Sequence, residues 1–167
     1  HIDEAGAVAG ADKIRRVVAE GAQLGIALDG DADRVVVVDA KGSIYDGDQL
    51  LYAIVKQRAA KEKIAGVAGT LMTNLALEQA FGRMQVPFAR AAVGDRYVLE
   101  LMREKKWLYG GENSGHIICL DKHTTGDGIV SALQVLCALR ATGKSLAGLT
   151  SDLRMFSQVL VNVKGPR

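Results

Sequence analysis

Cysteine is scarce in this sequence, and the chain also lacks two kinds of segment that direct proteins to membranes. Its 167 residues include two cysteines, Cys119 and Cys137, which stand in apolar surroundings and form no Cys-x-x-Cys pair. Two cysteines are too few for a disulfide framework, so both are predicted to be small buried side chains. No apolar run approaches the length of a transmembrane helix, and residues 1–4 are unlike a secretory signal. We therefore expect a cytoplasmic protein with no membrane partner.

The chain also has little excess charge of either sign. It carries 21 basic and 19 acidic residues, which gives a formal net charge of +2. A balance this even produces no strong overall field, so nucleic acid is not an expected partner. A charged substrate would then be attracted by charged groups near its binding site and not by the net charge of the chain. With 49% hydrophobic residues, a chain of this length can bury a sizeable core and favours one domain with room for part of another.

Three carboxylates alternate along a loop that follows an apolar strand. Residues 24–34 read Leu-Gly-Ile-Ala-Leu-Asp-Gly-Asp-Ala-Asp-Arg, which places Asp29, Asp31 and Asp33 at every second position. This spacing can direct three oxygens at one hard cation, and Mg²⁺ with open coordination positions suits phosphoryl transfer. A calcium loop of the EF-hand type is excluded, because its sixth and twelfth positions hold Arg34 and Ala40 instead of Gly and Glu. A solvated acidic turn remains an alternative.

A second polar loop lies about 80 residues further along the chain. Residues 110–116 read Gly-Gly-Glu-Asn-Ser-Gly-His and precede the apolar run 117–120. The glycines allow a ligand to approach the backbone closely, and the polar side chains offer donors and acceptors to a polyhydroxylated ligand. We expect this loop to line a wet cleft, with a polar turn carrying one surface histidine as the alternative.

Helical and strand patterns alternate along the chain. We expect helices over 9–20, 49–61 with Asp48 as its N-cap, 74–84, 96–105, 128–141 and 146–154. We expect strands over 24–28, 35–38, 44–45, 64–68, 87–91, 107–109, 117–120 and 158–163. The order predicts an α/β fold, a layered domain with a mixed, largely parallel sheet flanked by helices. A domain boundary is expected near 41–46.

The two loops together resemble those of the α-D-phosphohexomutase family. Residues 29–34 are similar to the metal-binding loop of that family, and residues 111–116 are similar to its sugar-specificity loop. Three further segments, 69–74, 93–98 and 121–128, resemble the phosphoglucosamine mutase branch. The resemblance covers nearly the whole chain. One departure is Ala32, where the family often has glycine.

The resemblance implies that the chain is a part of a four-domain enzyme. Residues 1–43 would be the C-terminal part of domain 2 with the metal loop, 44–163 would be domain 3 with the sugar loop, and 164–167 would begin the linker to domain 4. The family's phosphoserine loop of domain 1 and phosphate-binding loop of domain 4 do not occur in this sequence. Domains 1 and 4 of the same polypeptide are therefore expected partners, and the fragment alone is expected to be inactive.

The resemblance also implies an isomerase that moves a phosphoryl group within a sugar. Glucosamine 6-phosphate and glucosamine 1-phosphate would be interconverted through a phosphoserine and a bisphosphate intermediate, in bacterial synthesis of UDP-N-acetylglucosamine. The implied cofactors are Mg²⁺ and an activating glucosamine or glucose 1,6-bisphosphate.

Individual roles follow from the same resemblance. Asp29, Asp31 and Asp33 would hold the metal. Arg34 and His116 are the candidate catalytic residues, although Arg34 could instead pair structurally with one of the aspartates. The candidate substrate-binding residues are Glu112, Asn113, Ser114, His116 and Arg96, the last of which could equally form a salt bridge with a neighbouring acid.

Three alternatives stay open at this point. A phosphomannomutase or phosphoglucomutase of the same family would use the same loops. A Mg²⁺-dependent phosphatase of the haloacid-dehalogenase type also places Asp-x-Asp after a strand, and there Asp29 would become phosphorylated. A noncatalytic module that binds metal or sugar phosphate is the third.

Overall fold

The structure, a computed structural model, describes residues 16–159. The helix expected over 9–20 is seen only at 16–19, because its earlier part lies outside the described residues. Most of the closing strand expected over 158–163 also lies outside them, and residues 158 and 159 are not in a strand. None of the helices in residues 16–159 is long and apolar enough to cross a membrane.

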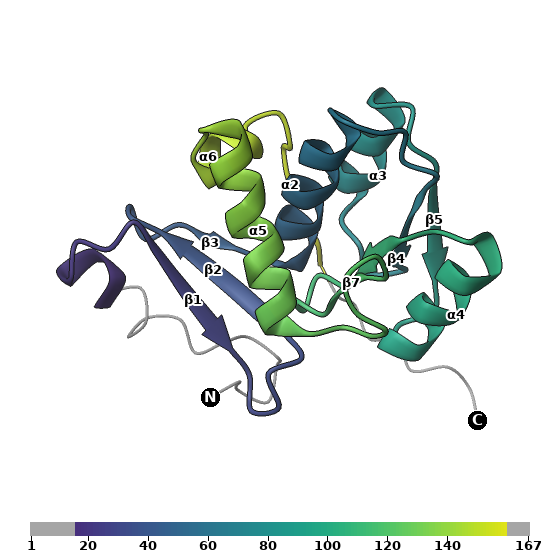
Figure 1. Cartoon of the computed structure of the whole chain (residues 1–167), viewed down its shortest axis with the longest axis horizontal. Coiled ribbons are helices and arrows are strands. Elements are labelled where there is room, and N and C mark those ends of the chain that lie inside the picture. The colour runs from purple at the N-terminus through teal and green to yellow at the C-terminus, as the bar shows by residue number, and fades with distance from the viewer. Residues whose placement is uncertain (1–15, 160–167) are drawn as a thin grey trace.

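A small antiparallel sheet carries the carboxylate loop. Strands β1 (Leu24–Leu28), β2 (Val35–Asp39) and β3 (Ile44–Tyr45) pair in the order β1-β2-β3. Leu28 lies opposite Val35 in the register, so residues 29–34 close the hairpin between them. Both strands that hold the loop are therefore fixed by ladder hydrogen bonds. Figure 1 shows β1 and β2 side by side at the left of the molecule.

The second sheet is mixed and mostly parallel, as predicted. Its strands are β4 (Val67–Thr70), β5 (Phe88–Ala91), β6 (Tyr109–Gly111) and β7 (Ile117–Cys119), in the order β5-β4-β6-β7. β4 is parallel to β5 and to β6, whereas β7 is antiparallel to β6. The polar loop is the connection between β6 and β7. The strands β4 and β6 begin three and two residues later than their apolar runs predict.

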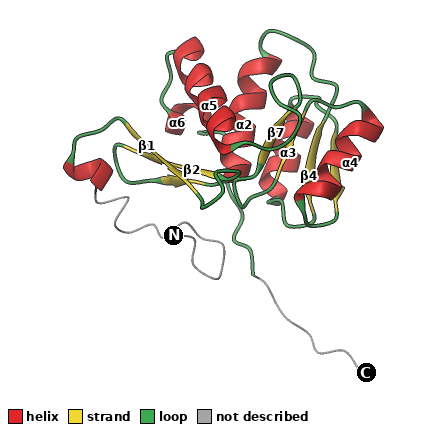
Figure 2. Ribbon diagram, turned by 60° about the horizontal axis from the view of Figure 1, so that its bottom comes forward, coloured by secondary structure: helices red, strands yellow, loops and turns green. Residues whose placement is uncertain are grey.

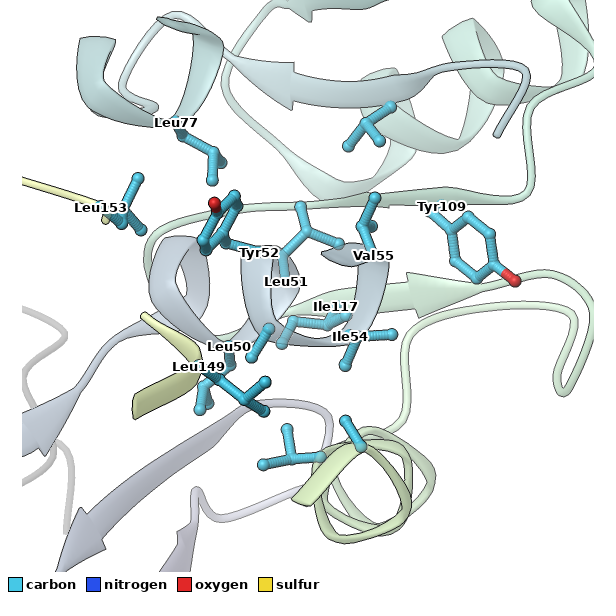
Figure 3. Close-up of a cluster of buried hydrophobic side chains, with 14 of the residues drawn as sticks. Leu50, Leu51, Tyr52, Ile54, Val55, Leu77, Tyr109, Ile117, Leu149 and Leu153 are labelled. Atoms are coloured by element: carbon cyan, nitrogen blue, oxygen red, sulfur yellow. The ribbon is translucent and has the colours of Figure 1, made fainter. Parts of the chain in front are cut away.

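Helices cover both faces of this sheet (Figure 2). They are α2 (Gly47–Ala59), α3 (Leu75–Arg83), α4 (Asp95–Lys105), α5 (Gly128–Thr142) and α6 (Leu146–Leu149). Neighbouring strand residues point to opposite faces, so Val67 packs into the core around α2 while Ala68 packs into the core under α4. The larger core surrounds α2, whose side chains are buried on most sides (Figure 3).

The start of α2 differs from the prediction. Asp46, and not Asp48, is the N-cap: its carboxylate accepts the Gln49 backbone N–H at 3.0 Å, and the Gln49 side chain accepts the Asp46 N–H at 3.2 Å. Asp48 is instead buried, and its Oδ2 accepts the Asn74 backbone N–H at 2.7 Å. That contact fixes the start of α3 against α2.

Two further predictions are corrected at α5 and α6. Cys119 is buried as expected, but Cys137 is exposed on α5. The outward side of α5 also carries exposed Ile129 and Leu133, so an apolar neighbourhood in the sequence does not indicate burial there. The last helix ends at Leu149 rather than at 154. Asp152 beyond it accepts hydrogen bonds from side chains of α2, which hold the following segment in place.

Asp48 makes the stability of the fold depend on pH. Burial raises the pKa of Asp48 to about 7, whereas an exposed aspartate has a pKa of about 3.9. Between these values the folded chain binds more protons than the unfolded chain, so the free energy of unfolding falls as pH rises from about 4 to about 7. We expect Asp48→Asn to remove this fall, which is of the order of 4 kcal/mol.

Urea unfolding of the wild type and the variant between pH 4 and 8 measures the effect. Glu104→Gln removes an exposed carboxylate and should leave the wild-type curve unchanged in shape. Parallel curves for wild type and Asp48→Asn would show that Asp48 ionises normally in the fold.

Candidate active site

The three aspartates of the β1–β2 loop converge. One carboxylate oxygen from each of Asp29, Asp31 and Asp33 lies within 4.8 Å of the other two. The loop folds back because Ala32 adopts a left-handed conformation with φ of 61° and because the Arg34 backbone N–H donates to Asp29 Oδ1 at 3.2 Å. Three hard oxygen ligands on one side of a short loop fit a small divalent cation such as Mg²⁺.

The carboxylates are not equivalent electrostatically. The side chain of Asp29 is 4% exposed and that of Asp33 is 34% exposed. Burial works against ionisation of Asp29, but the Arg34 backbone N–H, the Asp33 side chain and the Arg34 guanidinium together lower the pKa of Asp29. Burial and the hydrogen bond with Asp29 raise the pKa of Asp33. Asp29 therefore keeps its negative charge more readily than Asp33 does, and a cation can bind between the two carboxylates.

The polar loop between β6 and β7 is closed by its own backbone. The Glu112 N–H donates to His116 O at 2.9 Å, and the Gly115 N–H donates to Glu112 O at 3.1 Å. Gly115 has a φ of 100°, which glycine adopts at low cost. The Glu112 side chain is buried, and its Oε1 accepts the Gly94 backbone N–H at 2.9 Å.

The two loops lie side by side although about 80 residues separate them. The Val35 N–H donates to Gly115 O at 3.0 Å, and Arg34 and His116 form an antiparallel bridge. His116 Nδ1 lies 3.1 Å from Asp33 Oδ2. The start of α5 joins them, because the Gly128 N–H donates to Ala32 O at 2.8 Å. Backbone pairing therefore fixes the carboxylates relative to the polar loop.

A pocket of about 310 Å³ opens where these loops meet, and we call it the polar pocket. It is lined by Asp33, Arg34, Val93, Gly94, Asp95, Glu112, Asn113, Ser114 and His116. Within residues 16–159, three buried side-chain atoms of these residues have no hydrogen-bond partner: Arg34 Nε, Ser114 Oγ and His116 Nε2. Buried polar atoms without partners are costly. The pocket is thus suited to a ligand with many hydroxyl or phosphate oxygens.

The structure brings most of the predicted site residues together, but not Arg96. Its guanidinium lies over the Tyr97 ring at 4.8 Å, and its Nε is 3.7 Å from Glu100. Arg96 does not line the polar pocket; the preceding residue, Asp95, does. A signal for the segment 93–95 was present in the sequence, because it directly follows a strand parallel to β4 and so reaches the same edge of the sheet as the polar loop.

Comparison with known proteins places the chain in a family. Residues 46–156 match the family described as "Phosphoglucomutase/phosphomannomutase, alpha/beta/alpha domain III". The chain is 62% identical over 161 residues to the phosphoglucosamine mutase of Dechloromonas aromatica and 64% identical over 159 residues to that of a Janthinobacterium species. These matches cover 96% and 95% of the chain but only 36% of each relative.

Solved structures share the fold. A phosphoglucomutase/phosphomannomutase family protein from Burkholderia thailandensis matches with a TM-score of 0.77 at 25% identity, over 86% of this chain and 31% of that protein. N-acetylphosphoglucosamine mutase from Aspergillus fumigatus matches with a TM-score of 0.65 at 17% identity, over 78% of this chain and 33% of that protein. The chain therefore belongs to the phosphoglucomutase/phosphomannomutase family.

Proposed function

We propose that this chain is the metal-binding and sugar-binding part of a bacterial phosphoglucosamine mutase, which interconverts glucosamine 6-phosphate and glucosamine 1-phosphate. The observation that carries the proposal is that the carboxylate loop and the polar loop meet at the polar pocket, where Asp33 contacts His116. Relatives with that name are 62–64% identical to the chain, which is a supporting argument. The chain spans about 36% of their length, so the activity of the whole protein is part of the proposal.

Asp29, Asp31 and Asp33 would hold Mg²⁺, as their convergent oxygens favour. The bound ion would offset negative charge on a phosphoryl oxygen near the loop. The Aspergillus fumigatus neighbour is described as a complex with GlcNAc-6P and magnesium, which is consistent with such a site in that protein. Arg34 lines the polar pocket beside the aspartates, where its guanidinium would bind the phosphate of the substrate.

The polar loop would bind the sugar. Glu112 Oε1 is engaged by Gly94, which orients the carboxylate, and Ser114 Oγ has no partner in the described structure. These two groups would accept from and donate to sugar hydroxyls, with Asn113 beside them. His116 would carry its proton on Nδ1 toward Asp33, which leaves Nε2 as an acceptor that can take a proton.

Several elements of the proposed reaction belong to other parts of the polypeptide. The phosphoserine of domain 1 and the phosphate-binding loop of domain 4 would complete the site, and a sugar bisphosphate would serve as a diffusible activator. Residues 1–43, 44–163 and 164–167 are proposed as the end of domain 2, domain 3 and the start of the next linker. The product would supply amino-sugar nucleotide synthesis in the bacterial cytoplasm.

The proposal predicts turnover only when these other parts are present. We expect the 167-residue chain alone to convert no glucosamine 6-phosphate, because the phosphoserine loop of the family does not occur in its sequence. A chimaeric mutase, in which this chain replaces the matching segment of the Janthinobacterium relative, should convert it. Glu112→Gln in the chimaera should lower kcat/KM by about 100-fold, since a charged hydrogen-bonding group in the pocket is lost. ³¹P NMR of the two sugar phosphates measures the conversion.

Glu104→Gln, an exposed glutamate on α4, is the matched control and should retain full activity. An inactive chimaera, or turnover by the purified chain alone, would contradict the proposal. Faster turnover of glucose or mannose phosphate would favour another specificity in the same family. The haloacid-dehalogenase alternative requires a covalent phosphate on Asp29; family membership speaks against it, and phosphate trapping on Asp29 is the direct test.

A further inference from the structure

Asp95 occupies a position in the polar pocket that the proposed reaction has not yet used. It is the first residue of α4, and it is one of the residues that line the pocket, together with Glu112 and Ser114. The hydrogen bond from the Gly94 N–H to Glu112 Oε1, at 2.9 Å, holds the start of α4 against the polar loop. The backbone therefore keeps Asp95 beside the residues proposed to bind the sugar.

The other carboxylates of the pocket each make at least one contact with other residues of the chain. Asp33 lies 3.1 Å from His116 Nδ1 and 3.9 Å from Arg34 Nε, and it belongs to the three-aspartate cluster. Glu112 accepts from Gly94. Within residues 16–159 the Asp95 side chain has neither an ion pair nor a hydrogen bond, and it does not cap α4, whose N-cap is Gly94. Asp95 is thus the carboxylate of the pocket whose side chain has no such contact.

Charge in the pocket points to the chemistry of that ligand. Asp33, Asp95 and Glu112 bring three carboxylates, against the single guanidinium of Arg34. A hydroxyl both donates and accepts hydrogen bonds and is served by Ser114, Asn113 and Glu112. An ammonium group has donors only, and a carboxylate is the complementary partner. An extra acidic group favours binding only where the ligand brings positive charge.

We propose that Asp95 binds the protonated amino group of an amino-sugar phosphate and is the residue that selects this substrate over its hydroxyl analogue. The inference rests on the proposed mutase function and assigns the part of its specificity that a hydroxyl-binding loop does not supply. It also gives the Val-Gly-Asp-Arg segment at 93–96 a purpose: Asp95 faces the sugar, while Arg96 pairs with Glu100 away from the pocket.

A purely structural role for Asp95 makes a different prediction. An acid in the first turn of α4 interacts favourably with the helix dipole. Its loss would then lower stability slightly and affect every substrate alike. Substrate selection, in contrast, changes one substrate relative to another, so a ratio separates the two roles.

The test uses Asp95→Asn in the chimaeric mutase. The KM of glucosamine 6-phosphate and the Ki of glucose 6-phosphate as a competitive inhibitor are measured in the same assay. We expect the ratio of Ki to KM to fall by about 10-fold, because the amide keeps the shape of the carboxylate and removes its charge. Asp95→Glu should restore part of the ratio. Glu100→Gln removes the exposed acid that follows on α4 and should leave the ratio unchanged.

Each outcome has one meaning. A ratio that falls in Asp95→Asn and recovers in Asp95→Glu supports the assignment. An unchanged ratio, or equal weakening of both sugar phosphates, overturns it and leaves the mutase proposal intact. A chimaera that acts on neither glucosamine nor glucose phosphate contradicts the mutase proposal itself.

Discussion

We expect the simultaneous replacement of Asp29, Asp31 and Asp33 by asparagine to abolish divalent-cation binding by this chain and to leave its fold intact. The three oxygens lie within 4.8 Å of one another, and Mg²⁺ binding depends on their negative charge. Asparagine keeps the size and one carbonyl oxygen but not the charge, so affinity should fall by at least about 100-fold, or roughly 3 kcal/mol. Titration with Mn²⁺, followed by electron paramagnetic resonance, measures the free ion directly.

The matched control is Asp121→Asn, which removes a carboxylate that pairs with Lys122 and Arg58 outside the loop. It should bind Mn²⁺ like the wild type. Equal Mn²⁺ affinity in wild type and triple variant, or no binding by the wild type at millimolar ion, would leave an ordinary acidic turn as the better description.

Local chemistry explains why the two loops could be found in the sequence. The carboxylate loop follows directly from Asp-x-Asp-x-Asp after an apolar run, and most strands follow from short apolar segments. Residues whose roles depend on distant contacts were harder to place. Asp46 directly precedes α2 and Asp48 lies in its first turn, and an aspartate at either position is a residue type that commonly caps helices. Only the Asn74 N–H, 26 residues away, commits Asp48 to burial and leaves the cap to Asp46.

A distant contact also explains why Asp95, and not the expected Arg96, lines the polar pocket. Consecutive helix residues point about 100° apart, so one step along α4 moves a side chain from the pocket to its flank. The sequence shows which segment reaches the edge of the sheet but not how α4 is rotated about its axis. That rotation is set by Val98 and Met102, which pack beneath α4 on the sheet.

Gly115→Ala should be the most destabilising single substitution at the junction of the two loops. Gly115 has a φ of 100°, a conformation that residues with a side chain rarely adopt. A Cβ there would also overlap the carbonyl group of Val35, which is backbone and part of a sheet, so it has little freedom to move. Backbone strain of about 1–2 kcal/mol and overpacking of about 1–3 kcal/mol predict a loss of roughly 2–5 kcal/mol. Urea unfolding gives the free energy.

Gly143→Ala separates these two contributions. Gly143 also has a positive φ, 66°, at the C-terminus of α5, but no atom lies within 4 Å of its added Cβ. In this control the free energy of unfolding should fall only by the cost of backbone strain, about 1 kcal/mol. The difference between the variants then measures how tightly the Val35–Gly115 contact holds the loops together. Equal losses would mean that the polar loop can shift away from the carboxylates, and the geometry of the polar pocket would then not be fixed by this chain alone.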